Sequence, residues 1–249
     1  MSRMDTAHYK VILAYNGSGF AGFQRQRSAR TVQGEFETSL RELGWRGESI
    51  LAAGRTDAGV HASGQVVSFK LDWAHSSNNL LHALNYYLPQ DMAAQSVEEV
   101  ASDFHPRYDA ISRFYRYRCF CQTVRNPLRE DFSWRIWPAA SIDRMNTAAK
   151  SLIGSHDFKA FGRATTDSGV TVREVFSAAW REAGDELQFD IIANAFLYHM
   201  VRRIVLVLVR IGQGEKPVHL VTESLESEQM TLTGLAPSKG LFLQEVSYT

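Results

Sequence analysis

Apolar residues along the first part of the chain recur with two different periods, and the change of period predicts both strands and helices. The clearest helix begins after Thr31, because apolar residues then recur at every third or fourth position, and Gly44 is well placed to end it. Runs of β-favouring residues bounded by turn signals predict the strands. We expect strands at residues 9–15, 49–53, 65–71 and 93–99 and helices at residues 32–43 and 81–88.

The second part of the chain repeats this order of elements. Residues 111–122 alternate as in a long strand, and Ser141 is placed to cap a helix that stops at Gly154. Strands are also expected at residues 172–180, 186–193 and 241–248 and a helix at residues 198–211, while residues 222–229 fit either helix or loop. Each half mixes strands with helices, which predicts an α+β fold. With the boundary near Pro106, we expect an N-terminal domain of residues 1–107 and a C-terminal domain of residues 108–249.

Length and composition are typical of a folded chain. Its 249 residues, 45% hydrophobic and 22% charged, can bury a substantial core. Residues 1–8 lack the apolar core of a signal peptide, and the longest apolar run, residues 204–209, is too short to span a bilayer. We therefore expect a cytoplasmic protein without membrane contact. Cys119 and Cys121 share one strand face, which disfavours a structural disulfide, and the scattered histidines predict no metal site.

Positive charge is concentrated locally. Lys plus Arg and Asp plus Glu number 27 each, so the formal net charge is zero, which is not typical of a protein that coats nucleic acid. Residues 107–135 nevertheless interleave cations with aromatic rings. This basic and aromatic band contains Arg113, Arg116, Arg118, Arg125, Arg129, Tyr108, Phe114, Tyr115, Tyr117 and Trp134. It indicates either an RNA-binding surface or a solvated strand face with extended arginines.

A glycine-bearing loop between two predicted strands carries the most suggestive acidic residue. The loop reads Gly54, Arg55, Thr56, Asp57, Ala58, Gly59, Val60, His61. Glycines let a backbone approach a ligand closely or adopt a positive φ. On these residues alone, Asp57 is either a functional carboxylate or the residue that closes an Asx turn.

The loop, together with residues 65–69, closely resembles the catalytic motif of the tRNA pseudouridine synthase A family, in which the aspartate is the essential residue. Further matches follow in the family's order at residues 22–26, 104–107, 113–117, 198–205 and 240–243. Asn16, Phe23 and Leu206 depart from the family's pattern without removing a residue of the expected chemistry.

The resemblance implies a pseudouridine synthase fold, with two ferredoxin-like or RRM-like halves whose mixed, mainly antiparallel sheets join around a central cleft. It also implies a homodimer that acts on the anticodon stem-loop of tRNA, typically at uridines 38, 39 and 40. The reaction breaks the C1′–N1 bond, turns the uracil and forms a C1′–C5 bond. Because this isomerisation is redox-neutral, no cofactor is expected.

The same resemblance assigns roles to individual residues. Asp57 supplies the carboxylate, which attacks C1′, attacks C6 or abstracts the 2′ proton, and the sequence leaves these routes open. Arg202 is the expected partner, since a nearby cation favours an ionised carboxylate. Tyr115 would stack on the flipped base and help remove the C5 proton, with Leu241 as the opposite wall. The other residues expected to bind substrate are Arg25, Arg55, His61, Arg107 and Arg113.

Two other classes of function fit part of the pattern. An RNA-binding module without catalysis would keep the basic and aromatic band but would not need Asp57 to pair with Arg202. A hydrolase would cleave a glycosidic bond, but that chemistry normally uses two carboxylates, and the Asp57 loop supplies one.

Overall fold

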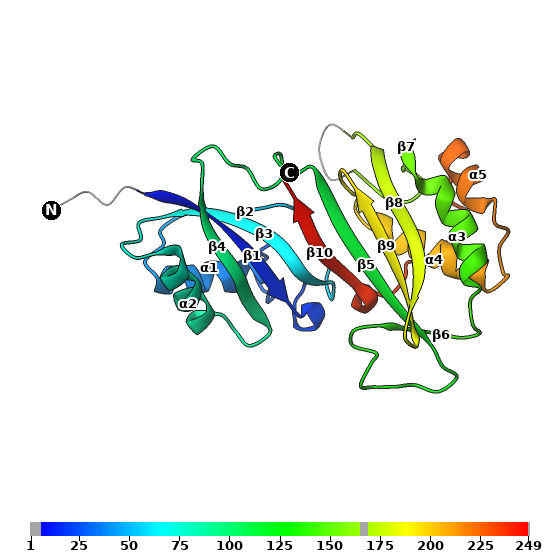
Figure 1. The fold of residues 1–249 in the computed structure, drawn as a ribbon, viewed down its shortest axis with the longest axis horizontal. Helices are drawn as coiled ribbons and strands as arrows, with labels where there is room; N and C mark the ends of the chain where they lie inside the picture. Colours follow the sequence, from blue (N-terminus) through cyan, green and yellow to red (C-terminus); the bar gives the residue numbers. More distant parts are fainter. Residues whose placement is uncertain (1–5, 165–168, 249) are drawn as a thin grey trace. The chain divides into compact units, whose positions relative to one another are not determined.

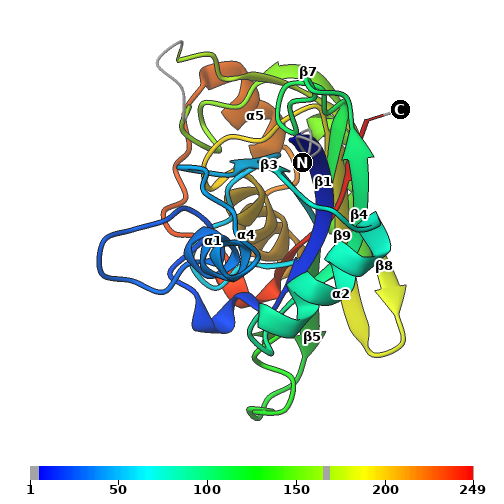
Figure 2. The ribbon, with the colours of Figure 1, turned by 90° about the vertical axis from the view of Figure 1, so that its left-hand side faces the viewer.

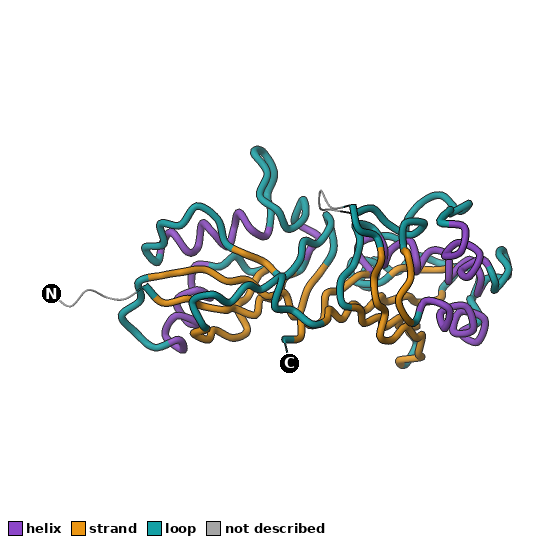
Figure 3. The backbone as a smooth tube through the Cα atoms, turned by 90° about the horizontal axis from the view of Figure 1, so that it is seen from above, coloured by secondary structure: helices purple, strands orange, loops and turns teal. Residues whose placement is uncertain are grey.

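The computed structural model describes residues 6–164 and 169–248, so the first five residues of the 1–8 segment lie outside the described part. The chain divides into two compact units. The first unit runs to Ile111 and resumes at Leu243, and the second comprises Ser112–Phe242. Figure 1 labels the helices and strands along the chain, and Figure 3 shows that each unit contains both kinds of element. The expected α+β class is confirmed.

The first unit combines antiparallel strands with two α-helices. In chain order its elements are β1 (Ala7–Tyr15), the 3₁₀ turn η1 (Gly17–Gly19), α1 (Val32–Glu42), β2 (Leu51–Ala52), β3 (His61–Leu71), α2 (Ser77–Tyr87) and β4 (Met92–Val100). The strand order is β4-β1-β3-β10, with β10 (Leu241–Ser247) last, and β2 pairs with β3. Phe36 of α1 packs on Phe69 of β3 with ring centroids 5.9 Å apart. α2 lies beside α1 (Figure 2), where the Ser39 hydroxyl donates to the Tyr87 carbonyl.

The second unit also packs helices on a sheet. Its elements are β5 (Ser112–Cys121), β6 (Trp134–Ile136), α3 (Ile142–Ala149), η2 (Lys150–Leu152), β7 (Gly154–Asp157), β8 (Val172–Ala183), β9 (Glu186–Ala193), α4 (Met200–Gly212), α5 (Leu220–Ser227) and η3 (Ser238–Gly240). The strand order is β5-β9-β8-β7, antiparallel throughout, and β6 adds to β5 in parallel. Asn146 ties α3 to β8 by two hydrogen bonds with the backbone of Trp180.

Most predicted elements are present within a few residues of their expected bounds. β9 matches its prediction at both ends, and α1 is capped as expected, since the Thr31 hydroxyl accepts from the Gly34 amide at 3.3 Å. Three differences matter. The undecided residues 222–229 fall largely in α5, β6 and β7 were not predicted, and β3 begins at His61 instead of Gln65. His61 is therefore a strand residue.

The division of the chain differs from the one expected at residue 107. The first unit extends to Ile111 and includes the C-terminal residues from Leu243, which the sequence had assigned to the second half. The reason is packing at the end of the chain. The Tyr248 hydroxyl donates to the Pro106 carbonyl at 2.8 Å, and the Ile111 amide donates to the Ser247 carbonyl at 2.8 Å.

No helix within residues 6–164 and 169–248 has the length and apolar character that a membrane span requires. The joined sheet and central cleft concern the placement of the two units relative to each other and stay predictions.

Candidate active site

Asp57 lies in a short irregular segment of the first unit between β2 and β3. Backbone hydrogen bonds attach this segment to residues 20–23, which follow η1. The Phe23 amide donates to the Thr56 carbonyl at 3.0 Å, and the Gly59 amide donates to the Phe20 carbonyl at 3.4 Å. The Val60 amide closes a turn by donating to the Asp57 carbonyl at 3.1 Å. Backbone bonds on both sides of Asp57 therefore hold its position.

Close approach of the two chain segments requires glycine at two positions. Gly22 has φ +99°, and a Cβ atom there would lie 3.2 Å from the Thr56 carbonyl oxygen and 3.3 Å from the Ala58 nitrogen. A Cβ atom on Gly17 would lie 2.0 Å from the Val60 carbonyl oxygen, which no side chain can tolerate. The segment that carries Gly17 and Gly22 thus fits the Asp57 loop without a gap.

Buried polar side chains support the same loop from the sheet. The Tyr15 hydroxyl and the Thr56 hydroxyl lie 2.8 Å apart in a hydrogen bond, and Gln65 donates to the Gly54 carbonyl at 3.1 Å. Burial raises the pKa of Tyr15 to about 12, although hydrogen bonds with Thr56 and Gln65 oppose part of that rise. Tyr15 therefore keeps its proton throughout the physiological range.

His61 is buried beside the segment that carries Gly17. Its side chain is only 1% exposed, and its Nδ1 accepts a hydrogen bond from the Gly17 amide at 3.0 Å. A buried ring that is committed to the backbone is poorly placed to meet a phosphate. The ring is buried in β3, which begins at His61, and a substrate contact of His61 stays a prediction.

The arginines of the first unit differ in the contacts that their side chains make within the protein. Arg55 is exposed and has no ion-pair or hydrogen-bond partner among the described residues. Arg25 forms an ion pair with the fully buried carboxylate of Glu37 and donates to the Glu48 carbonyl at 3.2 Å. Arg107 is half-buried, with its guanidinium 5.9 Å from the ring centroid of Tyr108. Arg55 is thus a better candidate for phosphate contact than Arg25.

In the second unit, α4 and the chain before η3 position Arg202. Its Nε donates to the Ala236 carbonyl at 2.8 Å, and its own carbonyl accepts from the Ala236 amide at 3.1 Å. These reciprocal bonds fix both the backbone and the start of the guanidinium group. The first turn of α4 follows His199, which has a left-handed backbone with φ 68° and whose ring stacks on Tyr198.

Tyr115 is half-buried on β5, and its ring contacts that of Phe196. The two rings meet edge to face, with centroids 5.0 Å apart and planes at 83°. Phe196 lies far along the chain, between β9 and α4, so no local pattern predicts this contact. The edge-to-face contact restrains the Tyr115 ring.

Leu241 opens β10 and is buried, directly after Gly240. A Cβ atom on Gly240 would lie 2.7 Å from the ring of Tyr117, which is itself fully buried and donates to the Pro237 carbonyl. Tyr117 therefore belongs to the core of the second unit.

The basic and aromatic band is largely neutralised within the protein. Arg113 is buried and donates to the Asn194 carbonyl at 2.6 Å. The arginine ion pairs of the band are Arg116 with Asp190, Arg118 with Glu186, Arg125 with Glu130, Arg129 with Asp185 and Glu186, and Arg135 with Glu130. The alternative interpretation, a solvated strand face, describes these arginines better than a continuous RNA-binding surface.

The expected partners Asp57 and Arg202 belong to different units, so their pairing stays a prediction. Among the described residues, no group of three or more His, Cys, Asp or Glu side chains is arranged to hold a metal ion.

Comparison with known proteins identifies the family. A family model described as tRNA pseudouridine synthase matches residues 11–109 and 148–249. A protein of Geobacillus kaustophilus named tRNA pseudouridine synthase A is 39% identical, with 98% of this chain and 95% of the relative covered. A protein of the same name from Limosilactobacillus fermentum is 38% identical, with 96% and 95% covered.

A solved chain titled as part of a Cbf5-Nop10-Gar1 complex overlaps 82% of this chain and 45% of its own length, at 13% identity and a TM-score of 0.36. That overlap is too weak to carry an argument. The family match and the near-full-length relatives confirm the resemblance seen in the motifs. The chain belongs to the tRNA pseudouridine synthase family.

Proposed function

We propose that this protein converts uridine to pseudouridine in tRNA, with Asp57 as the catalytic carboxylate. The observation that carries the proposal is the fixed backbone around Asp57, whose neighbours Thr56 and Gly59 bond to the chain around η1. Relatives similar along nearly their whole length are named tRNA pseudouridine synthase A, which supports the same activity. A carboxylate on a preorganised loop can act without reorganising in each turnover.

The chemistry requires only groups that the chain supplies. The C1′–N1 bond breaks with its electron pair going to the uracil, the detached ring turns, and C5 forms a new bond to C1′. The proton on C5 then leaves, N1 gains a proton, and the sum is an isomerisation. Asp57 acts as a nucleophile at C1′ or C6 or as a base toward the 2′ proton, and each route needs the ionised carboxylate.

The second unit supplies the other groups in this proposal. Arg202, fixed by its two bonds with Ala236, provides the cation that favours ionised Asp57. Tyr115, restrained by Phe196, stacks on the flipped base, and its hydroxyl assists removal of the C5 proton. Leu241 forms the opposite apolar wall.

The substrate is a uridine of the anticodon stem-loop, typically at positions 38, 39 and 40, and the working form is a cytoplasmic homodimer. A phosphate contact from the first unit comes from Arg55, which is exposed beside Asp57. Phosphate contacts position an RNA without reading its sequence. Arg25, Arg107 and Arg113 are the remaining candidates for such contacts.

Tritium release from tRNA that carries C5-labelled uridine tests the reaction. Isomerisation exchanges the C5 hydrogen and leaves pseudouridine in the chain. An RNA-binding module releases no tritium, and a hydrolase frees the base without forming pseudouridine. Tritium release together with pseudouridine in the product therefore selects the proposed function over both alternatives.

A further inference from the structure

A buried polar network supports the Asp57 loop from strands β1 and β3. Tyr15 is the last residue of β1, and its side chain is 4% exposed. Its hydroxyl bonds to the hydroxyl of Thr56, which is 7% exposed and directly precedes Asp57. Gln65 of β3, completely buried, donates to the Gly54 carbonyl at 3.1 Å. The network thus reaches the loop on the N-terminal side of Asp57 at two points.

The two anchors come from rigid elements. Tyr15 and Gln65 lie on neighbouring antiparallel strands, close to the point where the regular pairing of β1 and β3 shifts between Leu13 and Tyr15. That irregularity sets the end of β1 beside the loop, where Tyr15 pairs with Ala62. A hydroxyl buried without a partner is costly, so Thr56 has a strong preference for the position in which it meets Tyr15. The loop itself has no regular secondary structure to hold it.

We propose that Tyr15 is a positioning residue for the reaction, acting through the Thr56 hydroxyl to place the Asp57 carboxylate, with Gln65 fixing the start of the loop. Tyr15 itself does not touch the substrate. This inference rests on the proposed function, in which Asp57 is the catalytic carboxylate.

Loss of the Tyr15–Thr56 bond should lower kcat and leave KM nearly unchanged. A misplacement of about 1 Å at a reacting group costs on the order of 100-fold in rate, so a smaller shift of the loop should cost about tenfold. The variants Tyr15→Phe and Thr56→Val each remove one partner of the same bond. The double variant should be no slower than the slower single variant, because the bond is already lost.

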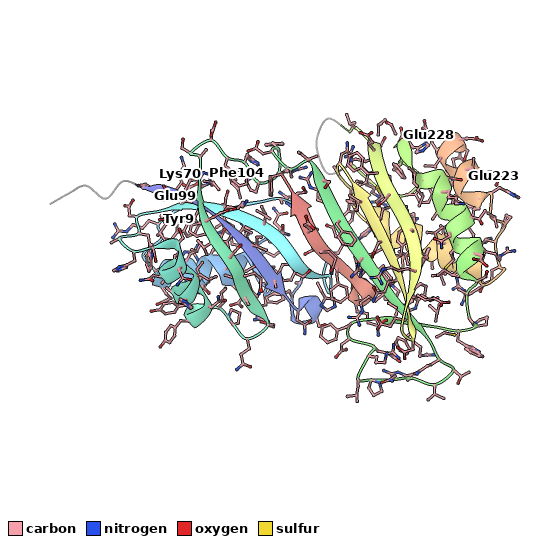
Figure 4. All side chains as sticks on the ribbon, viewed as in Figure 1. Tyr9, Lys70, Glu99, Phe104, Glu223 and Glu228 are labelled. Carbon is pink, nitrogen blue, oxygen red and sulfur yellow. The ribbon has the colours of Figure 1, made fainter. Side chains whose placement is uncertain are left out.

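Tyr9→Phe is the matched control. Tyr9 lies on the same strand, is similarly buried at 3% exposed, and stands near Glu99 at the far end of β1, as the labels in Figure 4 show. Its removal should leave kcat unchanged. Thr56→Ser keeps the hydroxyl and should restore most of the kcat that Thr56→Val loses. All variants are compared at equal folded fraction, measured by thermal unfolding of the full chain.

The outcomes separate the inference from the function on which it rests. If Asp57→Asn is inactive while Thr56→Val matches Thr56→Ser in kcat, the positioning role is wrong and the catalytic assignment stands. This pair of variants decides the matter even where Tyr15→Phe folds poorly. Equal loss of kcat in Tyr9→Phe and Tyr15→Phe would also overturn the inference, because it would indicate a general effect on the strand. An active Asp57→Asn variant would instead overturn the proposed function.

Discussion

Replacing Gly22 with alanine should damage catalysis beyond its effect on stability. A residue with a side chain pays about 1–2 kcal/mol in a left-handed backbone, and Gly22 has φ +99°. The new Cβ would also lie 3.2 Å from the Thr56 carbonyl oxygen and 3.5 Å from the Asp57 carbonyl carbon. The loop must then move by a few tenths of an ångström, which should lower kcat by on the order of tenfold.

Gly44→Ala supplies the matched control for backbone strain. Gly44 has φ +87°, and no atom lies within 4 Å of the position of its added Cβ. Both variants should therefore lose about 1–2 kcal/mol of folding free energy from strain, which corresponds to a fall in Tm of about 2–8 °C for a chain of this size. Only Gly22→Ala should also lose kcat in a tritium-release assay. Unchanged kcat in Gly22→Ala, or equal losses in the two variants, would refute the reasoning.

Three further predictions concern the second unit and the electrostatics of docking. Tyr115→Phe should bind tRNA better than Tyr115→Ala, because the ring is kept, and full isomerisation by the Phe variant would exclude a role for the hydroxyl in proton transfer. Arg202→Met should lose most activity, because the Asp57 carboxylate then lacks its expected cation. Arg210→Met breaks only a surface pair with Glu215 and should be normal. Arg55→Gln should lower the slope of log binding constant against log salt concentration for tRNA by roughly 0.7–0.9. Arg116→Gln should leave this slope unchanged, because Arg116 is paired with Asp190. Equal slopes for the two variants would contradict the docking model.

Most helices and strands were predicted correctly because the spacing of apolar residues that identifies them lies within a short stretch of chain. Helical spacing after Thr31 and a glycine stop identify α1, and alternation identifies β5 and β9. β6 was missed because three residues are too short to show a period, and it forms by pairing with β5 in parallel. The return of the chain from Leu243 to the first unit depends on contacts with Pro106 and Ile111, far away in sequence. No local pattern can encode such contacts.

The contacts around Asp57 also join residues that are far apart in sequence, so local patterns could not predict them. Motif resemblance made Asp57, Arg202 and Tyr115 the candidate site residues, but it could not indicate that His61 is buried against the Gly17 amide. It also could not reveal the support from Tyr15, which lies more than forty residues before Asp57 and reaches it through Thr56. Several arginines of the basic and aromatic band pair with Asp185, Glu186 and Asp190, which lie outside the band. The composition of a segment does not predict which of its arginines form ion pairs with residues of other strands.

Base-resolved mapping of pseudouridine in tRNA tests the central claim most directly. Unmodified tRNA is incubated with the wild-type protein or with Asp57→Asn, which keeps the shape of the side chain but removes its charge. The wild type should introduce pseudouridine in the anticodon stem-loop, and Asp57→Asn should introduce none while binding tRNA within a few fold of the wild type. Absence of pseudouridine with the wild type, or its formation by purified Asp57→Asn, would contradict the account.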